Sequence, residues 1–131
     1  MPTHNANNER TKRRYFAYLR EAKRHSEPTV DAVAKALARF ESDTKFRDFK
    51  SFHFEQAIAF KRRLTEQKSL KTGERLSKAT LHATLANLKA FFQWLAGQPG
   101  FKSKLKYSDA EYFNMSANDA AIATDRAVQP L

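Results

Sequence analysis

The residues most able to do chemistry are basic and hydroxyl side chains that gather between Lys61 and Lys89. Lys and Arg supply charge, and Ser and Thr supply hydrogen bonds, so this combination suits a phosphate group. Ser77 is a good N-cap, and the free backbone N–H groups at a helix N-terminus attract anions. The sequence therefore predicts a phosphate-binding site that comprises Lys71, Arg75, Ser77, Lys78 and Thr80, flanked by Lys61 and Arg62. His82 and Lys89, further along the same helix, complete the set of candidate binding residues.

Single members of this set also have simpler interpretations. Ser77 could only cap a helix, and Lys71 and Arg75 could only solvate a loop. His82 lies where a side chain could read a base in a major groove, or it is simply an exposed histidine. The cluster, more than any one residue, favours binding of an anion.

Catalytic and metal-binding patterns are missing from the sequence. The chain has no cysteine, and its histidines, at positions 4, 25, 53 and 82, have no second ligand at helical spacing. Neither a Walker phosphate loop nor a dinucleotide glycine pattern occurs, and Asp109 with Glu111 most simply favours a helix start. We expect no cofactor, no metal and no complete active site.

The overall charge points to a polyanionic partner. The 131 residues carry 24 Lys and Arg against 14 Asp and Glu, a net charge of +10. Such an excess on a small domain suggests double-stranded DNA, although solubility alone would also explain it. No apolar run reaches the ~20 residues that span a bilayer, and no signal peptide is recognisable. We expect a soluble, intracellular protein.

The site must be positioned by the helix predicted between Ser77 and Gly97. Its apolar residues alternate at steps of four and three, which places on one buried face Leu81, Leu85, Leu88, Phe92 and Leu95. One shoulder of that face carries Lys78, His82, Lys89 and Gln93, and the other carries Phe91 and Trp94. This helix can bind an anion on one side while it packs on another.

Further helices are predicted over residues 9–25, from a Thr29 cap through Phe40, over residues 53–67, and in a short segment capped by Ser108. Between residues 42 and 54 we expect a connector that inserts phenylalanine rings into the core. The prediction is an all-α bundle of four main helices and a short fifth. Residues 1–8 would be a flexible leader, 9–116 the domain, and 117–131 a linker.

The first helix carries another basic cluster. Between Arg10 and Arg24 seven Lys and Arg residues face only Glu21. Such a helix could lie on anionic lipid, but its apolar face is narrow and aromatic, so we expect no membrane binding. We expect this cluster and the one around Lys61 to follow the phosphates of the same DNA site.

A family resemblance rests on the loop LKTGERL, the following SKATL and the later LKAFFQWL. Over residues 9–115 the chain resembles the N-terminal core-binding, SAM-like domain of tyrosine recombinases of the phage integrase type. The resemblance implies a helical bundle on one face of the DNA, other recombinase protomers as partners, and a bacterial or phage-derived, nucleoid-associated protein. It also implies a separate catalytic domain beyond residues 117–131.

The family's catalytic pattern His-x-x-Arg is absent, because no histidine of this chain has an arginine three residues after it. The resemblance therefore implies a non-catalytic DNA-binding module, monomeric in isolation, whose tyrosines are structural. A helix-turn-helix regulator is an alternative, although it needs a turn of about three or four residues, shorter than the loop before Ser77. An α-helical protein-interaction module that uses Phe91 and Trp94 is another.

Overall fold

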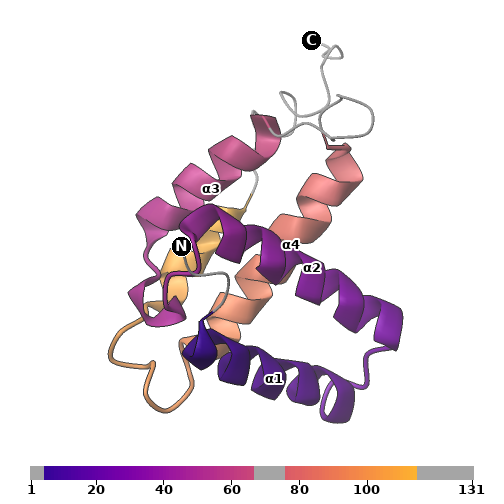
Figure 1. The fold of residues 1–131 in the computed structure, drawn as a ribbon, viewed down its shortest axis with the longest axis vertical. Coiled ribbons are helices and arrows are strands. Elements are labelled where there is room, and N and C mark those ends of the chain that lie inside the picture. Colours follow the sequence, from indigo (N-terminus) through magenta and orange to yellow (C-terminus); the bar gives the residue numbers. More distant parts are fainter. Residues whose placement is uncertain (1–4, 67–75, 115–131) are drawn as a thin grey trace.

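A computed structural model describes residues 5–66 and 76–114, and in these ranges every regular element is a helix (Figure 1). The elements are α1 (Ala6–Glu21), α2 (Glu27–Thr44), η1 (Phe49–Ser51), α3 (Phe54–Glu66), α4 (Lys78–Leu95) and η2 (Tyr107–Phe113), where η marks a 3₁₀ helix. The all-α prediction is confirmed. The loop around Lys71 and Arg75 and the segment 117–131 lie outside the described residues.

Helix α4 is the centre of the domain. Its five predicted stripe residues, from Leu81 to Leu95, are all fully buried. Both α2 and η2 pack against this helix, and Figure 1 shows α2 crossing in front of it. The prediction of a leucine-rich core helix is confirmed.

Phenylalanine rings fill the space between α4 and the other elements. Phe52 stacks on Phe92 with 3.9 Å between ring centroids, and on Phe113 with 5.5 Å. Phe49 is also buried, as predicted for the connector. Phe54, at the end of the predicted connector, does not enter the core and is 39% exposed. It stands at the first position of α3 and contacts the exposed ring of Tyr112 instead of the core.

The first helix begins earlier than predicted. Asn5 caps α1 by accepting a hydrogen bond from the backbone N–H of Asn8 at 3.1 Å, so the helix starts at Ala6 and not at Glu9. Asn8, expected in a loose leader, is buried and bonded to its surroundings. A polar side chain that is satisfied in the core has no signature in the hydrophobic pattern.

Two other helix starts also differ from prediction. Helix α2 follows Ser26, so Thr29 lies inside its first turn and is not the cap. Pro28 occupies that same turn, where its missing N–H costs no hydrogen bond. Segment η2 follows Lys106, so Ser108 is a helical residue and not its cap. No helix in the described ranges is long and apolar enough to cross a membrane.

Alkaline pH should unfold the domain through Tyr15. This ring is 3% exposed and lies 5.0 Å from Phe91 between centroids. Burial, with a smaller contribution from Tyr18, raises the pKa of Tyr15 to about 12 from 10.0. The unfolded chain loses this proton first, so stability is intact below pH 10 and falls as the pH rises towards 12.

The Tyr15→Phe variant removes the ionisable hydroxyl group and keeps the aromatic ring in the core. We expect its melting temperature to match the wild type at pH 8 and to exceed it at pH 11.5. Thermal unfolding followed by circular dichroism checks both values. Equal losses in the two proteins at pH 11.5 would contradict the assignment to Tyr15.

Candidate nucleic-acid interface

The N-terminus of α4 is built as the sequence predicted. The Ser77 hydroxyl oxygen accepts a hydrogen bond from the backbone N–H of Thr80 at 3.1 Å and donates one to the Thr80 hydroxyl at 3.0 Å. Lys78 is exposed beside this cap. The capping role of Ser77 is confirmed, and a role in phosphate binding stays a prediction.

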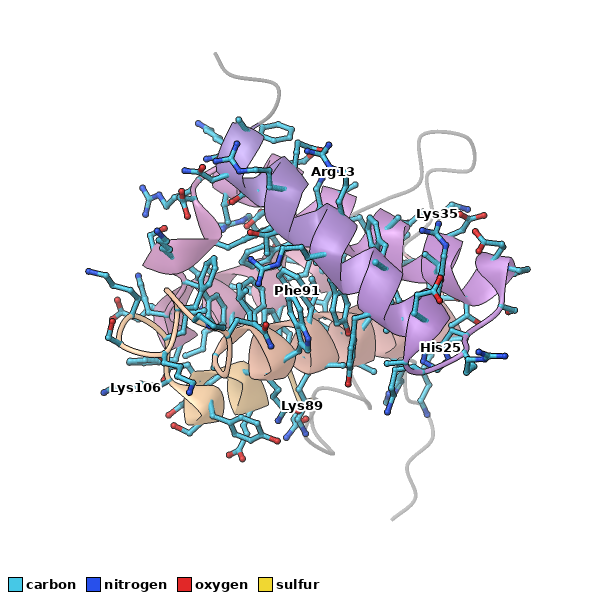
Figure 2. The ribbon with its side chains drawn as sticks, turned by 90° about the horizontal axis from the view of Figure 1, so that it is seen from below. Arg13, His25, Lys35, Lys89, Phe91 and Lys106 are labelled. Carbon is cyan, nitrogen blue, oxygen red and sulfur yellow. The ribbon has the colours of Figure 1, made fainter. Side chains whose placement is uncertain are left out.

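One turn further on, a shallow groove runs between α4 and the end of η2. Its cavity volume is about 290 Å³. His82, Lys89 and Gln93 line it from α4, and Phe113 and Asn114 close its other side. Figure 2 shows Lys89 projecting next to η2. We call this feature the α4–η2 groove. Of the four residues predicted on one shoulder of α4, three line this groove and Lys78 does not. The other residues of α4 in its lining are apolar.

Lys61 reaches the same place from a different helix. Its ammonium Nζ donates a hydrogen bond to the backbone oxygen of Asn114 at 2.7 Å. This contact is possible because η2 packs against both α3 and α4. Lys61 therefore contacts Asn114, a residue that lines the groove together with His82 and Lys89.

Arg62 and Arg63 lie outside the groove. Arg62 is exposed on α3 and does not line the groove. Arg63 points to α2, where its guanidinium donates two hydrogen bonds to Asp43, at 2.5 and 2.8 Å. This hydrogen-bonded carboxylate raises the pKa of Arg63. Arg63 thus forms an ion pair that links α3 to α2.

The sequence reasoning missed Asn114 and Phe113 as parts of the groove. Phe113 could be recognised as a core residue, but no local pattern connects the end of η2 with Lys61 or Lys89. Only the packing of η2 between two helices brings them together.

The alternative in which Phe91 and Trp94 contact a partner protein is wrong for Phe91. Its side chain is 0% exposed, beneath Tyr15. Trp94 is half-buried, with its ring centroid 4.9 Å from that of Tyr15 and 5.9 Å from that of Tyr18. Helix α1 occupies this flank.

Comparison with protein families gives one match. The family model described as "Phage integrase, N-terminal SAM-like domain" matches residues 13–98, which run from α1 through the end of α4. Comparison with curated proteins and with solved structures gives no significant match. The match covers well over half of the chain and agrees with the all-helical fold. The chain therefore belongs to the family of phage integrase N-terminal SAM-like domains, the modules of tyrosine recombinases that act in DNA integration and recombination.

Proposed function

We propose that this domain binds the double-stranded DNA of a recombination site through backbone phosphates, centred on the α4–η2 groove. The observation that carries the proposal is that His82 and Lys89 line one groove with Asn114, and that Lys61 donates a hydrogen bond to this same Asn114. Lys89 is half-buried, so its position is restrained by the groove and little ordering is needed on binding. The net charge of +10 supplies the long-range attraction.

The proposed contact surface continues along α4 to its N-terminus. From Lys78 to Lys89 the helix rises by roughly 16 Å. That length corresponds to about five base pairs of B-DNA. Ser77 and Thr80 would bind a phosphate at one end, and His82 would reach towards a base edge between them. Arg62, exposed on α3, would add charge to this surface, and Lys71 and Arg75, outside the described residues, stay predicted DNA contacts.

The module itself would not cut DNA. The chain has no His-x-x-Arg pattern, and strand cleavage would belong to a separate catalytic domain of the recombinase. Family membership supports other recombinase protomers as partners on the DNA.

The experiment is a salt titration of DNA binding. If about five phosphates are contacted, the logarithm of the association constant should fall with the logarithm of salt concentration with a slope of about −4 to −5. Fluorescence anisotropy with a labelled 20-base-pair duplex gives this slope. A flat response would reject DNA binding.

The variant Lys89→Gln locates the contact. We expect weaker binding and a slope reduced by about 0.9, since one phosphate contact is lost. Lys35→Gln is the matched control, because Lys35 is an exposed lysine of α2 that does not line the groove. A larger effect in the Lys35 variant than in the Lys89 variant would move the interface away from the groove.

A further inference from the structure

The outward surface of α1 is strongly basic, and the proposed contact surface on α4 does not include it. We call it the α1 surface. The residues that form it are all exposed: Arg10, Arg13, Arg14 and Arg20 of the helix, with Arg24 just beyond the helix end. Glu21 is the acidic residue of the same helical face.

The orientation of α1 is set by its inward side chains. Tyr15 and Leu19 are each 3% exposed and pack in the core. Lys12 also points inward, where its Nζ lies 2.6 Å from a carboxylate oxygen of Glu41 and 2.8 Å from one of Glu9. With this side anchored, the helical period directs the arginines to solvent.

Part of this charge has no counterion among the residues that the structure describes. Arg20 pairs with Glu27 at 2.8 Å, and Arg10 donates a hydrogen bond to Asn7. Within residues 5–66 and 76–114, Arg13 and Arg14 make neither a hydrogen bond nor an ion pair. Two consecutive arginines without such partners are suited to phosphates, because each guanidinium can bind a phosphate in a bidentate manner.

The α1 surface and the α4–η2 groove face in different directions. Figure 2 shows Arg13 and Lys89 on opposite sides of the domain, with the buried Phe91 between them. DNA is stiff over about 150 base pairs, so a short duplex seated on one surface does not bend around to the other. This placement argues against the expectation that both basic clusters follow one DNA site.

We propose that the α1 surface is a second DNA-binding surface, so that one domain can hold two duplexes at once. The inference rests on the proposed function for its first duplex only. An anionic membrane fits the surface less well, because Tyr15 and Leu19 face the core and the large apolar side chain that α1 exposes is Tyr18, at 37%. One such ring is too narrow an apolar face to insert among lipids.

The test measures the number of duplexes bound by the 131-residue chain. A random 12-base-pair duplex is titrated at low salt and at concentrations well above the dissociation constant. The wild type should bind two duplexes. The double variant Arg13→Glu/Arg14→Glu and the single variant Lys89→Glu should each bind one duplex. Capture of a free labelled duplex by a bead-bound duplex should fall at least tenfold in both variants.

The outcomes separate the two proposals. One duplex per wild-type domain, unaffected by Arg13→Glu/Arg14→Glu, would overturn the second surface and leave the groove intact. Suppose instead that the wild type binds one duplex, that the arginine double variant loses this binding, and that Lys89→Glu retains it. This result would reject the groove as a DNA-binding site and also the claim that the domain holds two duplexes.

Two controls complete the design. Lys102→Glu/Lys104→Glu makes the same change in net charge at exposed positions of the turn before η2, and it should still bind two duplexes. A loss equal to that of the arginine variant would assign the effect to net charge and overturn the proposal. Binding to vesicles with about one third phosphatidylserine that requires Arg13 and Arg14, with DNA capture unchanged in the variant, would identify a membrane surface instead.

Discussion

Replacing Lys12 with methionine should lower the free energy of unfolding by about 3 kcal/mol, because it leaves a buried carboxylate without its cation. Glu41 is 1% exposed, and its remaining side-chain partner would be Asn8, whose amide donates to it at 3.2 Å. Burial by itself lowers the pKa of Lys12, but the hydrogen bonds and charges of Glu41 and Glu9 outweigh it, and the net shift is upward. The pair therefore stabilises the fold while Lys12 is charged and loses its effect above pH 10.5.

The loss should be large because this pair belongs to a network. The Asn8 amide also donates to the backbone oxygen of Arg47 at 2.9 Å, and its carbonyl accepts from the N–H of Phe49 at 3.0 Å. The network thus connects the start of α1 to α2 and to the segment before η1. Removing one charge leaves polar groups in the core with fewer partners.

Urea unfolding measures this effect, with an unchanged m-value as the check that the same surface unfolds. The double variant Lys12→Met/Glu41→Leu should regain most of the loss, because no isolated charge remains. Arg14→Met, an exposed cation of the same helix, should change stability by less than about 0.5 kcal/mol. A cost below about 1 kcal/mol for Lys12→Met would mean that the pair behaves like one on the surface.

Replacing Phe113 with alanine should cost about 3–5 kcal/mol, in the range of large aromatic truncations in a core. Its side chain is fully buried against Phe52, Phe92 and Phe40, with ring centroids 5.5, 5.9 and 5.9 Å away. Because Phe113 also lines the α4–η2 groove, its loss should release the end of η2 and weaken DNA binding at temperatures where the domain is still folded.

The neighbouring residue provides the control. Tyr112 is 46% exposed and does not line the groove, so Tyr112→Ala should alter stability by less than about 1 kcal/mol and leave DNA affinity unchanged. Chemical denaturation and anisotropy with the labelled duplex measure the two effects. A Phe113→Ala domain that melts early but binds DNA normally below its transition would separate the core from the interface.

Some helix boundaries were not accessible from local patterns. Thr29 and Ser108 were predicted as caps because their residue types favour that role, but Ser26 and Lys106 occupy those positions. Cap preferences among neighbouring polar residues differ by only about 1 kcal/mol, so tertiary packing selects among them. Asn8 was missed for a related reason, since its burial depends on partners about 40 residues away, at Arg47 and Phe49.

The sequence by itself determined the all-α class, the buried stripe of α4, the Ser77 cap and the family. Each of these follows from residue type and from a period that holds within one helix or one motif. The tertiary structure alone decided that Lys61 contacts Asn114 at the edge of the α4–η2 groove, that α1 covers Phe91, and that Arg13 and Lys89 face opposite ways. These depend on how separate helices pack, and the helical period does not contain that information.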